Sequence, residues 1–141
     1  MPIERIDHVN VAAADLDTTR RFYRDVLGLS DGPRPPFQRP GAWMYLHGHP
    51  AVHISTGRIP KTRKSDAINH VAFAATGLVA MRETLRDRGL DFLEVGVPDA
   101  EQLQIFLHDP DGNEIELIYS GDEARAALLA GVPIDATALR P

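Results

Sequence analysis

The sequence repeats itself about sixty residues apart, and this repetition limits the possible folds more than any other feature. The segment Ile6-Asp7-His8-Val9 corresponds to Ile68-Asn69-His70-Val71, with a histidine at the same place in each copy. Later in each copy, Leu46-His47 corresponds to Leu107-His108. The chain is therefore predicted to contain two modules of the same architecture, joined in tandem.

Four polar residues occupy two pairs of equivalent positions on the predicted strands of these modules. They are His8, His53, His70 and Glu116. Side chains alternate between the two faces of a strand, so the polar residues lie opposite apolar neighbours such as Val9, Val52 and Val71. The helix of each module can cover the apolar face. The polar faces then turn inward, and we expect the four side chains to meet in one cavity.

The chemistry of this set is typical of a metal site. Three imidazole nitrogens and one carboxylate oxygen suit divalent Fe, Mn, Zn, Ni or Co. His8, His70 and Glu116 alone would form the two-histidine, one-carboxylate triad of non-haem iron enzymes, which leaves coordination positions open. We therefore predict one divalent metal ion, with His53 as either a fourth ligand or a base beside the metal.

The composition restricts the partners and the compartment. The chain has 141 residues, enough for one domain with a sizeable core, and a formal net charge of −5. This charge argues against nucleic acid or an anionic membrane as the main partner. No cysteine is present, so metal ligands must come from histidines and carboxylates. Because the sequence shows no apolar signal segment and no stretch of membrane-spanning length, we expect a cytoplasmic protein.

Each module is predicted to run strand, helix and then three strands, which makes the fold class α+β. The two βαβββ modules, residues 1–56 and 68–120, would form a curved mixed sheet around the metal cavity. Residues 57–67 would form a basic linker, and residues 121–141 a C-terminal helix and tail. We expect these parts to function as one domain.

Local signals place the helices and turns. Asp15 or Asp17 is the expected cap of the first helix, and Thr76 that of the second. Ser120 and Glu123 have the spacing of a capping box at the start of the C-terminal helix.

Two connections also have clear signals. Residues 31–40 are rich in proline and are predicted to form a stiff loop. Residues 47–50, His-Gly-His-Pro, are expected to turn the first hairpin.

The repeated βαβββ pattern, the strand histidine that opens each module and the closing segment from Phe106 to Leu117 resemble the vicinal oxygen chelate superfamily. Its members include glyoxalase I, methylmalonyl-CoA epimerase, fosfomycin-resistance transferases, extradiol dioxygenases and bleomycin-binding proteins. The resemblance covers about residues 4–120. It implies metal ligands on the first and last strands of each module, at the same four positions.

The residue at position 53 departs from the patterns of this family. Glyoxalase I has Glu there and the epimerase has Gln, and the glyoxalase residue also helps to move a proton. The resemblance therefore implies catalytic roles for His53 and Glu116 in addition to metal binding.

Three functions are compatible with the resemblance and the predicted site. The first is a metal-dependent isomerase or lyase of the glyoxalase or epimerase type, which binds a small substrate through vicinal oxygens and stabilises an enolate. The alternative is an Fe(II)-dependent extradiol-type dioxygenase that cleaves a catechol ring. The third is a metal-free protein that binds small molecules such as drugs. We expect a homodimer, and no nucleic-acid or membrane partner.

Further residues are candidates for contact with the substrate. Asn10 shares a strand face with His8, Trp43 could line the pocket or fill the core, and His108 could orient a substrate at the cavity rim. Several cations suggest that the substrate is anionic. They are Arg34, Arg39, Arg58, Lys61, Arg63 and Lys64.

Overall fold

The computed structural model describes residues 5–56, 68, 70–97 and 100–133 of the chain. The chain divides into two compact units. The first consists of Met1–Ala67 together with Asp109–Asn113, and the second consists of Ile68–His108 together with Glu114–Pro141. The turn at Asp109–Asn113, which connects two strands of the second module, thus belongs to the first unit.

The described residues form eight strands and three helices in an order that repeats once. In chain order they are β1 (Val9–Ala12), α1 (Leu16–Asp25), β2 (Ser30–Gly32), β3 (Gly41–Leu46), β4 (His49–Ser55), β5 (His70–Ala74), α2 (Leu78–Asp87), β6 (Phe92–Val97), β7 (Gln102–His108), β8 (Glu114–Ser120) and α3 (Gly121–Leu129).

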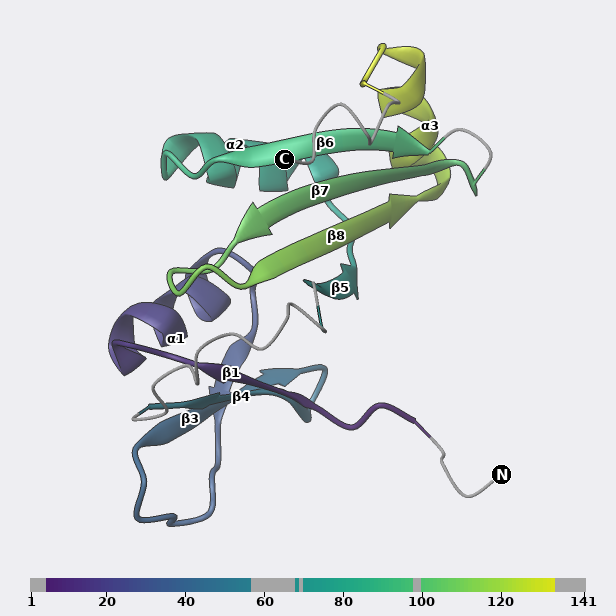
Figure 1. Ribbon diagram of the computed structural model, residues 1–141. Helices are drawn as coiled ribbons and strands as arrows, with labels where there is room; N and C mark the ends of the chain where they lie inside the picture. Colours follow the sequence, from purple (N-terminus) through teal and green to yellow (C-terminus); the bar gives the residue numbers. More distant parts are fainter. Residues whose placement is uncertain (1–4, 57–67, 69, 98–99, 134–141) are drawn as a thin grey trace. The chain divides into compact units, whose positions relative to one another are not determined.

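Each module has its own mixed sheet of four strands. The strand orders are β1-β4-β3-β2 and β5-β8-β7-β6, so the last strand of each module lies beside the first. In both sheets the pair formed by the first and last strands lies at one edge and is parallel, and the other pairs are antiparallel. Figure 1 shows β6, β7 and β8 side by side, with α3 following at the end of β8. The predicted α+β fold of two βαβββ modules is confirmed.

The core of the first unit lies between α1 and its sheet. Met44 on β3 and Val52 and Ile54 on β4 are almost completely buried, at 0%, 0% and 1% exposure. Helix α1 contacts both strands, and its Phe22 and Tyr23 are also buried. The alternation along β4 leaves His53 on the opposite face from the core residues.

The core of the second unit is larger. Ile105, Leu107 and Ile115 on the sheet and Leu85 on α2 are completely or almost completely buried. Helix α3 contacts β6, β7 and β8, and its Ala124 and Ala127 are buried. Hydrophobic burial of this kind is the main source of stability for both units.

The helix caps partly follow the predictions. Asp15 is the N-cap of α1, and its Oδ1 accepts a hydrogen bond from the Thr18 amide at 2.7 Å, which confirms the first of the two candidates. The predicted cap of α2 at Thr76 is wrong. Gly77 takes the cap position in a left-handed conformation with φ +78°, which places Thr76 one residue too early.

A carboxylate from α3 replaces the missing cap of α2. Glu123 accepts hydrogen bonds from the amides of Gly77 and Leu78 at 3.0 and 2.9 Å. The predicted capping box is therefore wrong, because Ser120 makes no side-chain cap hydrogen bond and Glu123 turns toward another helix.

Two predicted loops are shorter than expected. Residues 30–32 pair with Tyr45, Met44 and Trp43 as β2, so the irregular loop begins only at the first proline, Pro33. The first hairpin turns at His47 and Gly48, whose φ angles of +49° and +79° make a tight two-residue turn, and β4 already begins at His49.

The remaining predictions concern the ends of the modules. The basic linker at residues 57–67 lies outside the described residues.

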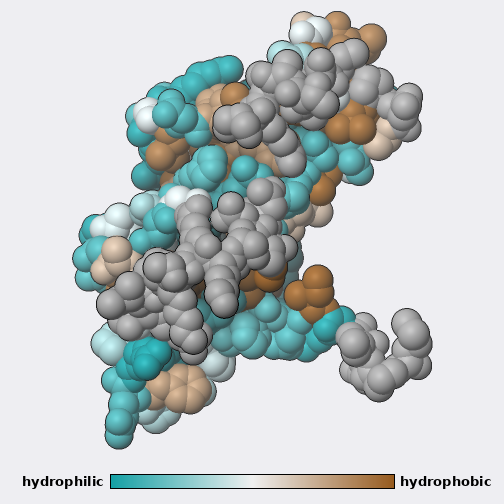
Figure 2. All heavy atoms as spheres, in the orientation of Figure 1, coloured by the Kyte–Doolittle hydropathy of each residue, from teal (hydrophilic) through white to brown (hydrophobic). Residues whose placement is uncertain are grey.

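After α3, the Pro133 carbonyl accepts a hydrogen bond from the Gly96 amide on the edge strand β6 at 2.7 Å. No helix in the described part of the chain has the length and apolar character needed to cross a bilayer. On the face shown in Figure 2, hydrophilic residues are interspersed with small groups of hydrophobic ones.

Candidate metal centre

Three aromatic rings are stacked across the sheet of the first unit. The rings of His8 and His53 are 3.8 Å apart between centroids, with planes inclined by 16°. On the other side, Trp43 stacks on His53 at 4.2 Å and 7°. The order of the rings follows the strand order, because His8 immediately precedes β1 while His53 and Trp43 are register partners on β4 and β3. The His53 imidazole is thus held between two rings.

The environment of His53 favours a neutral imidazole. Burial lowers the pKa of His53, and the neighbouring His8 acts in the same direction. The Nε2 atom of His53 is buried and has no hydrogen-bond partner in the described structure. A buried polar atom without a partner costs about 1–3 kcal/mol, so such atoms are rare unless something else binds them.

His8 is oriented by the residue before it. Its Nδ1 atom lies 2.9 Å from Oδ2 of Asp7, and this hydrogen bond lowers the pKa of Asp7. His49, which follows the hairpin turn, interacts through Nε2 with the Asp7 carbonyl oxygen at 2.6 Å. Because Asp7 engages Nδ1, the Nε2 atom of His8 is the nitrogen that could bind a metal.

The second unit contains a matching pair. Nε2 of His70 lies 2.8 Å from Oε2 of Glu116, whose side chain is only 7% exposed. Nδ1 of His70 lies 3.7 Å from Oε1 of Glu114, a buried oxygen that makes no hydrogen bond in the described structure. His70 therefore stands between two carboxylates that are neighbours on one face of β8.

The predicted ligands occur as two pairs, one in each unit. His8 lies with His53, and His70 lies with Glu116. Within the part of the chain that the structure describes, no group of three or more histidine, cysteine or carboxylate side chains is arranged to hold a metal ion.

Sequence reasoning missed two carboxylates next to these pairs. Strand alternation would place Asp7 on the opposite face from His8, but both residues precede β1, so the alternation does not apply to them. Glu114 could have been found, since it lies two residues before Glu116 and shares its strand face.

The predicted substrate residues have different surroundings. Asn10 pairs in register with His53 on the neighbouring strand, and its Oδ1 accepts a hydrogen bond from Ser55 at 2.8 Å. Trp43 forms the outer ring of the stack instead of filling the core. His108 is the last residue of β7; its side chain is exposed and lies 4.0 Å from Glu114.

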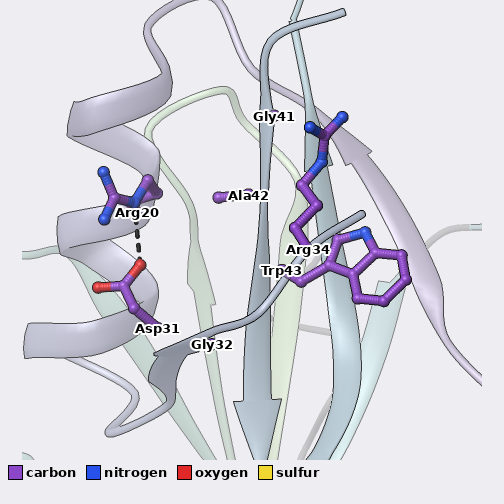
Figure 3. A pocket seen from close by; sticks show the side chains of 7 residues that line it. All are labelled: Arg20, Asp31, Gly32, Arg34, Gly41, Ala42 and Trp43. Atoms are coloured by element: carbon purple, nitrogen blue, oxygen red, sulfur yellow. Dashed lines mark hydrogen bonds and ion pairs between the residues drawn. The ribbon is translucent and has the colours of Figure 1, made fainter. Parts of the chain in front are cut away.

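A pocket opens beside Trp43 at the edge of the first sheet. It is lined by residues from α1, β2, β3 and the loop between the two strands, namely Arg20, Asp31, Gly32, Arg34, Gly41, Ala42 and Trp43. In Figure 3, Arg34 and Trp43 lie on one side of β3, and the ion pair of Arg20 with Asp31 lies on the other.

The family model described as the Glyoxalase/Bleomycin resistance protein/Dioxygenase superfamily matches residues 5–117, most of the chain and both modules. The chain belongs to this superfamily. The predicted resemblance to the vicinal oxygen chelate proteins is thereby confirmed.

Individual members of the superfamily agree with this assignment. The chain is 32% identical to Glyoxylase I 4 of Arabidopsis thaliana over 125 residues, covering 79% of this chain and 68% of that protein. It is 30% identical to lactoylglutathione lyase of Haemophilus influenzae, covering 81% and 91%. The crystal structure of a glyoxalase family protein from Bacillus anthracis superposes with a TM-score of 0.70 at 26% identity, covering 84% and 97%.

Proposed function

We propose that this superfamily member is a divalent-metal-dependent isomerase or lyase of the glyoxalase type. The proposed substrate is a small molecule with two vicinal oxygens, and the proposed ligands are His8, His53, His70 and Glu116. The observation that carries the proposal is the buried Nε2 of His53, which lacks a hydrogen-bond partner in the described structure and lies beside a second histidine. The similarity to a protein named lactoylglutathione lyase favours a lyase.

The donor atoms fit a divalent ion chemically. A metal ligand must be deprotonated, and the lowered pKa of His53 keeps its ring neutral at neutral pH. The contact of Asp7 with His8 is the carboxylate–histidine arrangement that commonly orients a metal-bound imidazole. Coordination would also give the buried Nε2 of His53 a partner.

Binding by both histidines of the first unit requires a small change. The lone pair of an imidazole nitrogen lies in the plane of its ring, so two nearly parallel rings stacked at 3.8 Å do not direct their lone pairs at one point. We expect His8 to turn. His53 is held between two rings, whereas His8 precedes β1 and its side chain is 39% exposed.

The pair in the second unit brings two possible donor atoms together. Nε2 of His70 and Oε2 of Glu116 lie 2.8 Å apart, and an imidazole nitrogen and a carboxylate oxygen are both ligands that a divalent ion takes. These two side chains would hold the ion in the second unit.

The residues then have distinct tasks in catalysis. The metal would supply a positive charge that polarises the two substrate oxygens. His53, as a neutral imidazole, or Glu116, as a buried carboxylate, would accept the proton that moves between carbons. Asn10 would contact the substrate from the strand beside His53, and His108 would contact it from the end of β7. We also propose a homodimer as the active form.

The test begins with metal content. Protein purified without added metal is analysed for bound ions and then loaded with Zn²⁺, Ni²⁺, Co²⁺, Mn²⁺ or, without oxygen, Fe²⁺. Activity is followed as solvent deuterium exchange into the hemithioacetal of methylglyoxal and glutathione. We expect metal-dependent exchange in the absence of oxygen, and its loss in His70→Ala.

Other outcomes would contradict the proposal. Strict dependence on Fe²⁺ and oxygen, with ring-fission products from catechols, would identify a dioxygenase. Failure to bind any of these metals, together with retention of small aromatic ligands, would identify a binding protein.

A further inference from the structure

The pocket beside Trp43 exists because β2 is short. β2 ends at Gly32, which pairs with Trp43, so Gly41 and Ala42 on β3 have no strand partner on that side among the described residues. The chain instead leaves the sheet at Pro33 and returns at Gly41. The space left at the sheet edge is a pocket of about 190 Å³, enough for a small planar group.

The charges that line this pocket are unequal. Arg20 and Asp31 form an ion pair, with Nε and Oδ1 2.9 Å apart, so they largely neutralise each other. Arg34 also lines the pocket but has no carboxylate partner in the described part of the chain. The pocket therefore presents one uncompensated guanidinium.

Arg34 is held in place by contacts that do not neutralise its charge. Its Nη2 donates a hydrogen bond to the Arg39 carbonyl at 2.8 Å, and its guanidinium lies 4.9 Å from the centre of the Phe37 ring. The backbone of Gly41 approaches closely, since a Cβ added there would lie 3.1 Å from Nη2. The guanidinium is thus positioned before any ligand arrives.

Trp43 connects this pocket to the candidate metal ligands. One face of its ring stacks on His53, and the residue also lines the pocket with Arg34 (Figure 3).

We propose that this pocket is an anion subsite, in which the Arg34 guanidinium binds a carboxylate of the substrate and Trp43 forms the adjacent flat wall. A planar guanidinium can bind a carboxylate through two parallel hydrogen bonds. The substrate class is then a small monocarboxylate whose vicinal oxygens lie on the side of His53. The location of the vicinal oxygens rests on the proposed function, whereas the carboxylate contact does not need the metal.

The subsite is tested on metal-free full-length protein from which the chelator has been removed by dialysis. Trp43 is the only tryptophan of the chain, so its fluorescence reports on this pocket directly. Benzoate and its neutral analogue benzamide are titrated into the wild type, Arg34→Gln, Arg34→Lys and Arg39→Gln. Arg39 is the matched control because its side chain is exposed and does not line the pocket.

We expect benzoate to quench Trp43 with saturation and to bind Arg34→Gln about tenfold more weakly, as for loss of a charge-assisted hydrogen bond. The affinity of Arg34→Lys for benzoate should be intermediate, and that of Arg39→Gln should lie within about twofold of the wild type. The affinity for benzamide should not change when Arg34 is replaced. If circular dichroism shows that Arg34→Gln does not fold, the benzoate affinity of Arg34→Lys is compared with that of the wild type instead.

Two results would overturn the subsite. One is an equal loss in Arg34→Gln and Arg39→Gln, which would indicate only a general surface charge. The other is equal binding of benzoate and benzamide. Failure of the protein to bind metal would contradict the proposed function but would leave this measurement unaffected.

Discussion

Among single residues, Asp7 has the role that follows most directly from one contact. Its carboxylate engages Nδ1 of His8, which leaves Nε2 as the nitrogen for the proposed metal. Asp7→Asn should weaken Zn²⁺ binding roughly 10–100-fold, because an amide orients the ring less firmly and leaves it less basic. Affinity is measured by competition with a chromophoric chelator.

The matched control for this variant is Asp91→Asn. Asp91 is exposed and makes no hydrogen bond or ion pair among the described residues, so its replacement should leave the affinity unchanged. Since Asp7 is also on the surface, neither variant should lower the free energy of unfolding of the metal-free protein by more than about 0.5 kcal/mol. Unchanged Zn²⁺ affinity in Asp7→Asn would contradict the role of Asp7 in orienting His8.

His53 should make the stability of the metal-free protein depend on pH. Its pKa lies below the ordinary value of 6.5, first because of burial. Between the folded pKa and 6.5, the unfolded chain binds a proton at this residue and the folded chain does not. The free energy of unfolding should therefore decrease as the pH falls through this window.

Urea denaturation at about pH 7.5 and 5.5 measures this effect. The loss of unfolding free energy on acidification should be smaller in His53→Gln, which has no titratable group at this position. An equal loss in the two proteins would assign the pH dependence to other residues.

At the scale of elements, α3 stabilises the start of α2. Glu123 supplies the carboxylate that caps Gly77 and Leu78, a task that no residue at the start of α2 performs. Glu123→Ala should lower the free energy of unfolding by about 1–2 kcal/mol, as for loss of an N-cap. Ser120→Ala is the control and should cost much less, because Ser120 makes no cap hydrogen bond. If urea denaturation showed that Ser120→Ala lowers the free energy of unfolding more than Glu123→Ala, the capping box would be supported instead.

A second link between elements joins α1 to the turn at Asp109–Asn113 in the first unit. The Tyr23 hydroxyl donates a hydrogen bond to Asp109 at 3.0 Å, and both residues are almost completely buried. Next to it, Thr19 donates to Asp111 at 2.7 Å. These contacts explain why the turn groups with the first unit.

Loss of the tyrosine hydroxyl should therefore be costly. Tyr23→Phe should lower the free energy of unfolding by about 1–3 kcal/mol, because the buried Asp109 loses a donor. Tyr45→Phe removes a hydroxyl that donates to the Pro33 carbonyl in an exposed position, and it should cost less than about 0.5 kcal/mol. Equal costs in urea denaturation would show that the buried bond adds nothing.

At the scale of the whole molecule, the four proposed ligands are His8 and His53 from the first module and His70 and Glu116 from the second. We propose that all four bind one ion, and a site that loses half of its ligands loses most of its affinity. The double variants His8→Ala/His53→Ala and His70→Ala/Glu116→Ala should therefore each lose all tightly bound metal. The wild type should bind about one ion per chain, measured by elemental analysis after gel filtration.

A different number of bound ions would show that the two modules bind metal independently. If each module bound its own ion, the wild type would hold about two ions per chain and each double variant would retain one. That result would contradict a shared site while leaving the fold unaffected.

Local patterns were sufficient to predict much of the architecture. The repeat predicted two βαβββ modules, and the Asp15 cap was correct because a cap depends on residues three apart in the chain. The repeat and strand alternation predicted that His8, His53, His70 and Glu116 meet in one cavity; within the described units His8 contacts His53 and His70 contacts Glu116, and the meeting of all four stays a prediction. The Thr76 cap failed because the carboxylate that takes its place comes from a helix more than forty residues later.

The sequence by itself determined the number of modules, their order of elements and which residues share a strand face, because these properties depend on periodicities of two and of about 3.6 residues. Only the tertiary structure decided which side chains touch across strands and between distant segments. The stack of Trp43 on His53 depends on the register of β3 and β4, and the bond of Tyr23 to Asp109 joins residues 86 positions apart. Such contacts depend on how the elements pack, and no short-range pattern in the chain records that packing.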